Sequence, residues 1–453
     1  MTALRDGALA VVRRLQEEGQ SAYWVGGCVR DLEMGREPHD YDIATDARPD
    51  RVSGLFPGSV MVGARFGVVA VPLGGNTYEV TTFRSEGPYA DGRRPTSVKF
   101  VSAEEDVRRR DFTINGLLHD PLSGKTLDHV GGREDIARRC LRTIGAPDVR
   151  FAEDRLRMLR AVRLAAELQF DIEAETFAAI RAQAAGITQI SAERIRDEIK
   201  RLVTAPGRGR GLWWLHESGL LAIILPEVAA THGVAQPPEY HPEGEVFTHT
   251  VMVVERLGKP SPVLGLAALL HDVGKPPTYT ETDRIRFNRH DEVGARMAEE
   301  ISRRLRLSND ETERIVELVR EHIRIKDLPK MRPAKAKRFL TREHIEDHLA
   351  LHRADCEASH GDLTVWNWAR KAIEELTEDE RRPPRLISGD DLIRMGYSPG
   401  PRFKKILEAV TDAQLEGRVR SGEEAEKLVK RKFPRNPRKR KTGGKRRPPS
   451  GNT

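Results

Sequence analysis

Two aspartates separated by a single residue, Asp40 and Asp42, are the strongest candidates for chemistry near the N-terminus. They belong to the segment Asp40–Ile43, whose alternating polar and apolar residues predict a half-buried strand. Side chains two positions apart in a strand point to the same face, so both carboxylates should project together, with Tyr41 opposite. Neighbouring carboxylates resist joint ionisation unless a cation lies between them. Mg²⁺ suits this position because it takes carboxylate oxygens and keeps sites open for phosphates.

A pair of glycines, Gly26 and Gly27, stands shortly upstream, after an expected strand at Ala22–Val25 and before an expected helix at Val29–Met34. Glycines at a strand-to-helix turn let backbone N–H groups approach a phosphate, and the helix start favours negative charge. Arg30 adds a charged donor that suits a triphosphate. Together with the two aspartates, this turn predicts a site for a nucleotide and a metal ion.

The segments GGCVRD and DYDIAT resemble the bacterial tRNA CCA-adding enzyme and poly(A) polymerase family of nucleotidyltransferases. The resemblance covers about the first 210 residues and continues in the family's order through Thr81–Arg84, a flexible-loop-like Tyr89–Pro95, Arg109–Asn115, Glu153–Ala161 and Ser191–Glu198. It implies that Asp40 and Asp42 bind Mg²⁺ and are catalytic. By the same resemblance, Gly27, Arg30 and Arg110 contact the nucleotide.

Asp154 and Arg157 stand three positions apart in an expected helix and should be neighbours on its surface. Cytosine and adenine each offer an amino donor beside a ring-nitrogen acceptor, whereas a carboxylate only accepts and a guanidinium only donates. The pair therefore complements C and A and opposes G and U, a mismatch that costs several kcal/mol when buried. Arg160 and Arg163 continue the three-residue step and resemble family positions that contact the triphosphate. The family commonly has Pro where this chain has Arg155, which removes a preorganised helix start. An ordinary surface ion pair is the alternative.

A second set of possible ligands lies in the middle of the chain, where a His-Asp pair follows an expected apolar helix at Leu264–Leu270. Imidazole and carboxylate groups suit first-row divalent metals. The arrangement resembles the HD phosphohydrolase superfamily, in which a His, a His-Asp pair and a late Asp bind metal, and two further histidines match the two-metal version. The resemblance implies the ligands His249, His271, Asp272, His290, His322 and Asp355. Partly buried polar histidines are the ordinary alternative, and His241 could be a ligand or a linker residue.

A chain of 453 residues is too long for one ordinary core. Strand and helix signals alternate up to residue 135, with further strands expected at Val68–Val71 and Tyr78–Thr82, and helical periodicity dominates to about 429. The expected fold class is α+β, a small N-terminal nucleotidyltransferase head of mixed sheet and helices followed by an all-helical body. The expected divisions are a head at 1–135, a helical neck that recognises the base at 136–235, an HD domain at 236–380, a C-terminal helical tRNA-binding region at 381–429 and a basic disordered tail at 430–453.

The net charge of +7 is concentrated at the C-terminus, since Lys430–Thr453 holds 11 Lys/Arg and no acidic residue, leaving the rest at −4. Such a tail suits non-specific phosphate contact or simply solubility. Three widely spaced cysteines form no C-x-x-C pair. No apolar run of about 18 residues indicates a membrane span, and the N-terminus lacks the pattern of a signal peptide. We therefore expect a cytoplasmic protein without a membrane partner, and the sequence suggests no protein partner.

The function expected from these features is template-independent addition of CCA to the 3′ end of tRNA from CTP and ATP by two-metal nucleotidyl transfer. Mg²⁺ is the expected cofactor, and a first-row divalent metal is expected in the HD domain with phosphohydrolase activity. The alternatives are a poly(A) polymerase or a CC-only or A-only enzyme on the same scaffold, a metal phosphohydrolase acting through the HD domain, and an RNA-binding protein without catalysis.

Overall fold

The structure, a computed structural model, describes residues 3–62, 67–87, 98–381 and 384–434. The expected flexible loop Tyr89–Pro95 and the tail beyond residue 434 lie outside this part of the chain. Two compact units divide it. The first comprises residues up to 322 together with 350–362, and the second comprises 323–349 and the residues from 363 onward. Both sites discussed below belong to the first unit.

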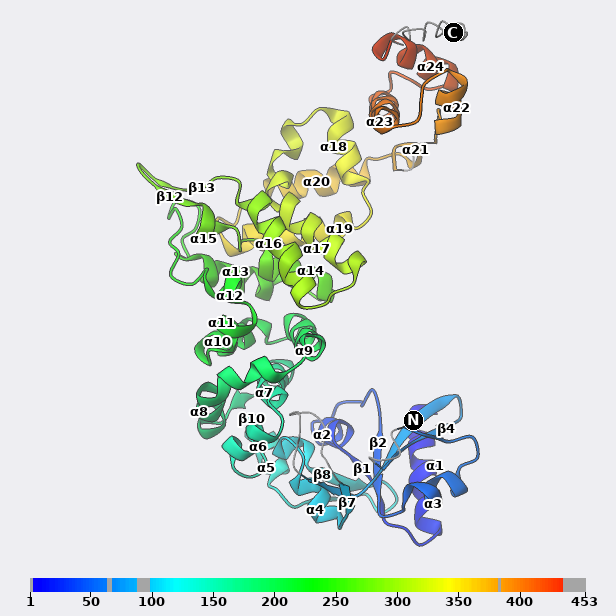
Figure 1. The fold of residues 1–453 in the computed structure, drawn as a ribbon, viewed down its shortest axis with the longest axis vertical. Helices are drawn as coiled ribbons and strands as arrows, with labels where there is room; N and C mark the ends of the chain where they lie inside the picture. Colours follow the sequence, from blue (N-terminus) through cyan, green and yellow to red (C-terminus); the bar gives the residue numbers. More distant parts are fainter. Residues whose placement is uncertain (1–2, 63–66, 88–97, 382–383, 435–453) are drawn as a thin grey trace, which may run out of the picture. The chain divides into compact units, whose positions relative to one another are not determined.

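The N-terminal part, blue to cyan in Figure 1, is built on a seven-stranded mixed sheet of order β3-β4-β5-β2-β1-β8-β9. Its strands are β1 (Ala22–Val25), β2 (Asp42–Thr45), β3 (Val60–Met61), β4 (Val68–Leu73), β5 (Asn76–Thr82), β8 (Leu117–Asp120) and β9 (Lys125–Asp128). A second small sheet pairs β6 (Arg84–Glu86) with β7 (Val98–Phe100). The accompanying helices are α1 (Ala3–Glu17), α2 (Gly27–Glu33), α3 (Pro49–Leu55), α4 (Ala103–Arg108), the 3₁₀ turn η2 (Thr113–Asn115) and α5 (Gly132–Ala137). The mixed sheet with helices confirms the expected head.

Strand β2 lies near the centre of this sheet, antiparallel to β1 and parallel to β5. It begins at Asp42, two residues later than the sequence predicted, because only from Asp42 onward does the backbone pair with β1. The expected alternation nevertheless extends upstream, since Asp40 and Asp42 are exposed while Tyr41 and Ile43 are buried. The Tyr41 ring packs edge-on against Trp24, with 4.7 Å between ring centroids. This packing anchors one face of the segment in the core and leaves both carboxylates on the other.

A helical body follows, as predicted, drawn from cyan through green and yellow to red in Figure 1. Its first part contains α6 (Pro147–Glu153), α7 (Leu156–Leu168), α8 (Ala174–Gln183), η3 (Ala184–Gln189), α9 (Ala192–Thr204), α10 (Arg208–Glu217), α11 (Leu220–Ile224) and α12 (Pro226–Ala229). The next part contains α13 (Val246–Arg256), α14 (Pro262–Leu270), α15 (Lys275–Thr278), α16 (His290–Arg304), α17 (Asn309–Glu321), η4 (His322–Lys330), α18 (Pro333–Leu340), α19 (Ile345–Ala358) and α20 (Thr364–Glu374).

The body is not purely helical, which corrects the sequence analysis. A parallel pair joins β10 (Cys140–Leu141) to β11 (Asp171–Ile172), and an antiparallel hairpin joins β12 (Tyr279–Glu281) to β13 (Ile285–Phe287). Each strand has only two or three residues, too few to produce a period-two signal in the sequence. The pairs therefore escaped detection without changing the fold class.

One apolar cluster runs from Phe112 through the helices of the first unit as far as Ala358. Arg208, at the start of α10, is 5% exposed and donates to the backbone carbonyls of Val254 and Glu255 at the end of α13, at 2.6 and 2.8 Å. These bonds satisfy carbonyls that the helix itself leaves open. Apolar packing and a buried arginine together connect the neck helices to the helices that carry the second candidate site.

The second unit has its own apolar clusters. Its last helices are α21 (Glu378–Arg381), α22 (Gly389–Arg394), α23 (Pro401–Leu415) and α24 (Gly422–Lys432). Helix α24 is capped by Ser421 and buries Leu428 and Val429, so helix continues to Lys432. The basic tail was expected to start at residue 430, and the helix extends past this position because its apolar face packs onto the unit. Among the described residues, no helix combines the length and the apolar character that crossing a membrane requires.

Candidate functional site

An open cleft of about 290 Å³ lies where the turn after β1, the start of β2, the segment after α4 and the start of α7 converge. Its lining includes six residues predicted to act on a nucleotide, which are Gly27, Asp42, Arg110, Asp154, Arg157 and Arg160. Four further residues, Gly26, Arg109, Asp111 and Asn115, complete it. Residues separated by more than 100 positions in the sequence thus meet in one place.

Gly26 is required for the cleft to exist in this form. It has φ 74°, a conformation that favours glycine, and a Cβ there would lie 3.7 Å from Asp42 Oδ2 and 3.6 Å from Arg110 Nη1. A side chain at this position would therefore enter the space between a carboxylate and a guanidinium. The turn keeps its backbone open towards both charged groups, as the sequence predicted for a phosphate-binding turn.

The Asp42 carboxyl has its pKa raised from 3.8 to about 6, first by desolvation in the cleft and then by the negative charges of Asp40 and Glu79. Asp40 therefore lies close to Asp42, as the strand alternation predicted, although it does not line the cleft itself. Glu79 was missed by the sequence analysis. It is the exposed residue between buried Tyr78 and Val80 on β5, the strand next to β2. A concentration of carboxylates with an elevated pKa fits a divalent cation.

The raised pKa of Asp42 gives a prediction for the ion-free protein. Ionising this carboxyl in the folded state costs stability, a cost absent below pH 3.8 and complete above pH 6. Asp42→Asn should therefore be more stable than the parent at pH 7 in EDTA, by ~1 kcal/mol once solvent screening is allowed for. Urea unfolding at pH 7 and pH 4 measures the difference, which should vanish at pH 4. A variant less stable than the parent at pH 7 would contradict it.

Arg160 is held by Asp111, which accepts from Arg160 Nε and Nη2 at 3.0 and 2.6 Å. Burial alone would raise the pKa of Asp111, but the Arg160 charge and hydrogen bonds lower it to about 2. Asn115 donates to Asp111 Oδ1 at 3.2 Å and accepts from Arg30 Nη1 at 2.9 Å. Arg30 thus lies behind the cleft and supports Asn115. Asp111 and Asn115 were missed as individual residues, although both stand in the RRDFTIN segment that was noted.

A buried carboxylate fixes the two arginines of the same segment. Asp106, which is fully buried, accepts from Arg109 Nη2 at 2.7 Å and from Arg110 Nη2 at 3.0 Å. Desolvation opposes ionisation of Asp106, but the charges of Arg110 and Arg109 lower its pKa below the ordinary value. Arg110 is therefore preorganised at the cleft rather than free to rotate.

Asp154 and Arg157 line the same cleft but do not share a helix, which corrects the predicted geometry. Helix α6 ends at Glu153 and α7 begins at Leu156, whose backbone N–H donates to Asp154 Oδ1 at 3.0 Å. The helix start is thus preserved even though Arg155 replaces the usual Pro. Asp154 forms its ion pair with Arg194 of α9, at 2.9 Å.

Arg157 is 7% exposed. Its Nη1 donates to Glu153 at 2.6 Å and to the Arg150 carbonyl at 3.1 Å, and its Nη2 donates to the Arg109 carbonyl at 3.1 Å. Arg163 is not brought into the cleft. It is 2% exposed and lies between Glu198 and Glu167, at 2.6 Å from each. A triphosphate contact by Arg163 therefore remains a prediction that this geometry does not favour.

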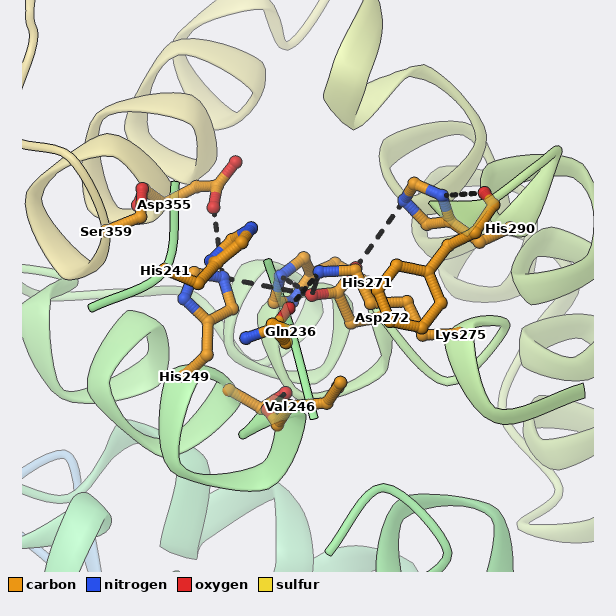
Figure 2. A network of polar contacts seen from close by, with 12 residues as sticks. Gln236, His241, Val246, His249, His271, Asp272, Lys275, His290, Asp355 and Ser359 are labelled. Carbon is orange, nitrogen blue, oxygen red and sulfur yellow. Dashed lines mark hydrogen bonds and ion pairs between the residues drawn. The ribbon is translucent and has the colours of Figure 1, made fainter. Parts of the chain in front are cut away.

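The second candidate site contains all six residues predicted as HD-domain ligands. Figure 2 labels five of them, His249, His271, Asp272, His290 and Asp355, with Asp272 near the centre. Asp272 Oδ2 lies 3.1 Å from His271 Nε2 and 3.8 Å from His249 Nε2. Its other oxygen, Oδ1, lies 3.6 Å from His290 Nε2 and 3.8 Å from His322 Nε2. Asp355 Oδ1 completes the first group at 3.0 Å from His249 Nε2. The geometry defines two adjacent donor groups that share one carboxylate.

Backbone carbonyls fix the orientation of three of the imidazole rings. His271, His290 and His322 have Nδ1 2.6–2.9 Å from the backbone carbonyls of Ala268, Phe287 and Val319, so Nε2 of each faces the centre. Burial lowers the pKa of His322 to about 3, which keeps it in the neutral form that binds metal. His271 Nε2 and both Asp272 oxygens are buried without a well-directed hydrogen bond among the described residues. Such a donor set fits divalent ions, and backbone-fixed imidazoles are typical of metal sites.

Lys275 and Gln236 adjoin the same centre. Lys275 Nζ lies 2.7 Å from Asp272 Oδ2 and donates to Gln236 Oε1 at 2.5 Å. Desolvation opposes the charge on Asp272, but the charges of His271 and Lys275 hold its pKa well below the ordinary value. Neither Lys275 nor Gln236 was predicted from the sequence, and a lysine three residues after the His-Asp pair was the only available signal.

Three family models match the chain. They are the poly A polymerase head domain at residues 22–142, the probable RNA and SrmB-binding site of polymerase A at 169–231, and the HD domain at 245–358. Among curated proteins, the chain is 47% identical over 223 residues to a CCA-adding enzyme of Geobacillus thermodenitrificans, covering 49% of this chain and 55% of the relative. It is 44% identical over 214 residues to one of Lactobacillus johnsonii, covering 47% and 54%. The chain thus matches about half the length of these relatives.

Among solved structures, the CCA-adding enzyme of Bacillus stearothermophilus in complex with CTP is 30% identical, with a TM-score of 0.70 over 95% of this chain and 98% of that one. The Thermotoga maritima CCA-adding enzyme complexed with tRNA is 19% identical, with a TM-score of 0.58 over 93% and 94%, and so supports the fold alone. The similarity to the Bacillus protein extends along almost the whole of both chains.

Proposed function

This chain belongs to the CCA-adding enzyme family, and we propose that it adds C, C and A to the 3′ end of tRNA, using CTP and ATP. The observation that carries the proposal is the cleft in which Gly26 and Gly27, Asp42 and the residues Asp154 and Arg157 meet, with the charge of Asp40 close to Asp42. The glycine turn and the aspartates suit a metal-bound triphosphate, and Asp154 with Arg157 suits the pairing edge of a base.

The tRNA 3′-hydroxyl attacks the α-phosphate of the nucleotide and expels pyrophosphate. Asp40 and Asp42 are the residues that would hold Mg²⁺, which supplies a lowered hydroxyl pKa and stabilisation of the leaving oxygens. Arg110 and Arg160, fixed by Asp106 and Asp111, bind the phosphates in a preset geometry. The residues position and polarise the reactants, and no covalent enzyme intermediate is required.

Base selection falls to Asp154 as acceptor and Arg157 as donor. The contacts of the described residues use three of the five Arg157 N–H groups, leaving Nε–H and one Nη2–H for a base. Both residues are fixed by neighbours, Asp154 by the Leu156 N–H and Arg194, and Arg157 by Glu153. A rigid acceptor–donor pair can reject G and U because the wrong edge leaves buried groups unpaired.

The test uses a tRNA transcript that lacks its CCA end, incubated with each nucleoside triphosphate alone and with all four. The proposal expects a two-nucleotide extension with CTP alone and a stop after three with all four nucleoside triphosphates. Long adenylate tails would favour the poly(A) polymerase, single additions of one kind would favour a partial enzyme, and no extension would favour a binding protein or an HD-only hydrolase.

Asp154→Ala should relax nucleotide choice. Removing the carboxylate acceptor eliminates its hydrogen bond to the amino group of C and A. It also eliminates the conflict between the carboxylate and the carbonyl of U and G. We therefore expect discrimination against UTP to fall at least tenfold, about 1.4 kcal/mol. Misincorporation assays with UTP and GTP measure it. Asp148→Ala, at an exposed position in the first turn of α6, is the matched control. Unchanged selectivity with reduced overall rate would contradict the assignment.

A second activity is favoured by the shared carboxylate of Asp272. We infer that the HD centre, formed by His249, His271, Asp272, His290, His322 and Asp355, hydrolyses phosphate esters. Divalent ions held by these ligands would lower the pKa of a water molecule and polarise the phosphoryl group. Release of phosphate from nucleoside monophosphates, measured with Mn²⁺, Ni²⁺ or Mg²⁺ added singly, tests the activity and identifies the preferred ion.

We further propose that residues 136–235 serve base recognition and that 381–429 bind tRNA. The second assignment is supported by the start of α23, where Pro401 opens the helix and Lys404 and Lys405 are exposed, so that charge and helix dipole both favour phosphate. The three cysteines are free, which fits a reducing compartment, and we place the reaction in the cytoplasm.

A further inference from the structure

The second unit carries a concentration of positive charge that the sequence analysis did not single out. Residues 324–342 hold eight Lys or Arg and one acidic residue, Asp327. Two of the cations are paired with carboxylates, Lys337 with Glu380 and Arg338 with Asp412. Four others are exposed and form no ion pair with any described residue, and they are Lys326, Lys330, Arg332 and Lys335. The segment is therefore a basic surface with charge available to a ligand.

A groove of about 380 Å³ lies at this basic segment, between α18 and α20, which are neighbours in Figure 1. One side is formed by the end of η4 and one face of α18, and the other side by Trp368, Ala372 and Leu376. Trp368 is 37% exposed, so solvent reaches its indole. Trp368 and the residues after it lie beyond the segment that the HD model matches, which ends at residue 358. The groove thus combines apolar walls with an accessible aromatic ring.

Basic residues and groove-lining residues alternate along the chain. Pro329, Met331 and Pro333 line the groove, whereas Lys330 and Arg332, which stand between them, are exposed. Two carboxylates also line it, but each has a cation beside it, Glu380 with Lys337 and Glu375 with Lys371. The charge left for a ligand at the groove is therefore positive.

An aromatic ring bordered by cations is the arrangement that binds single-stranded nucleic acid. Every base has a face that stacks on an aromatic ring, and the phosphates between successive bases attract the basic side chains. Bases in a duplex are already paired and stacked, so they leave no free face for an indole. An acidic protein segment fits less well, because Lys is depleted from the centre of protein–protein interfaces.

We propose that the groove between α18 and α20 binds single-stranded RNA, with one base stacked on Trp368 and the adjacent phosphates contacted by Lys330, Arg332 and Lys335. This site belongs to the second unit and shares no residue with the nucleotide cleft or with the HD centre. It is also separate from the tRNA contact proposed for 381–429. Stacking and charge select the unpaired state of the strand and not its base sequence.

The stacking contact is tested with full-length protein in EDTA and a fluorescently labelled oligouridylate of about ten nucleotides, a length in the usual range of single-strand sites. Fluorescence anisotropy should show tighter binding of this strand than of an RNA duplex of equal length. Trp368→Ala should weaken binding of the strand about tenfold, the effect expected from loss of one stacked base. Trp368→Phe, which keeps an aromatic face, should retain most of the affinity.

Ile393→Ala, at an exposed apolar residue of α22 in the same unit, is the matched control and should bind the strand as the parent does. Unchanged affinity in Trp368→Ala overturns the proposal. An equal loss of affinity for the strand and for the duplex in Trp368→Ala also overturns it, because the effect would then not come from stacking of an unpaired base.

The phosphate contacts are tested through the salt dependence of the same binding. Each contact to a single strand contributes roughly 0.7 to the slope of log affinity against log salt concentration. Replacing Lys330, Arg332 and Lys335 together by Ala should therefore reduce that slope by about two. The matched control removes two Lys and one Arg that are exposed in the first unit, and it should keep the slope; its positions are Lys125, Lys259 and Arg284. An unchanged slope in the first triple variant overturns the phosphate contacts.

Poly-glutamate at equal charge concentration should leave the Trp368-dependent binding intact. Displacement of the strand by poly-glutamate from the parent, but not from the triple variant, would identify an acidic protein segment as the ligand and overturn the RNA assignment. These readouts do not depend on nucleotide transfer. A protein that binds the strand as expected but fails to extend tRNA would contradict the proposed function and not this inference.

Discussion

Asp42→Asn should abolish nucleotide transfer to tRNA, lowering the rate by about 10³-fold or more. The exchange keeps the shape of the side chain and removes the charge that, with Asp40, would hold the ions. The stabilisation that such ions give to the transition state amounts to several kcal/mol, and each 1.4 kcal/mol is a factor of ten in rate. Asp40→Asn should have a similar effect because the negative charge of Asp40 acts on the Asp42 carboxyl.

Single-turnover extension of a radiolabelled tRNA measures the loss. Asp50→Asn, an exposed aspartate in the first turn of α3, is the matched control and should behave as the parent. Hydrolysis of phosphate esters at the HD centre should be retained in Asp42→Asn, which would show that the variant is folded. Transfer persisting in an Asp40/Asp42 double variant would refute the assignment of the first cleft.

Asp272→Asn should empty the HD centre of both ions, not one. The two oxygens of Asp272 face different groups of imidazoles, Oδ2 towards His271 and His249 and Oδ1 towards His290 and His322. An amide carries no negative charge and keeps only one acceptor oxygen, so Mn²⁺ bound at this centre should fall from two equivalents to none and ester hydrolysis should be lost. Addition of CCA to tRNA should continue at the parental rate.

His322→Ala separates this prediction from a general loss of structure. It removes a ligand on the Oδ1 side only, so one ion should remain with His249, His271 and Asp355. If Asp272→Asn and His322→Ala both retained one ion, the carboxylate would not be shared, and the two donor groups would be independent sites. Elemental analysis of the dialysed full-length proteins gives the count.

The sequence predicted the head well because its chemistry lies on regular elements. The alternation around Tyr41 placed Asp40 and Asp42 on one face correctly, since a buried aromatic determines which face of a strand is turned inward. Strand β2 begins two residues later than the sequence predicted, because its start is determined by pairing with β1, which is a tertiary property. The fold class was confirmed, including the mixed sheet and the helical body.

Residues that are neighbours only in the folded structure were harder to predict from the sequence. The sequence suggested that Asp154 and Arg157 are adjacent on one helix, whereas the helix breaks at Asp154 and Arg194, 40 residues away in sequence, becomes its partner. Glu79 and Asp111 were overlooked because no local spacing connects them to Asp42 or Arg160. Arg163 shows the limit of regular spacing, since the three-residue step leads to a position between two glutamates and not to the cleft, and its triphosphate contact stays an untested prediction.

The apolar cluster that begins at Phe112 and ends at Ala358 includes residues of all three family-model segments and crosses the boundaries between them. Cooperative folding blocks follow continuous cores, not homology segments. A fragment cut between the neck helices and the histidine centre would expose one half of this cluster and leave the Arg208 guanidinium without the carbonyls that it caps. Point substitutions at either centre would therefore leave this shared core intact, whereas removal of residues 245–358 would expose the apolar side of the neck helices that also support the nucleotide cleft.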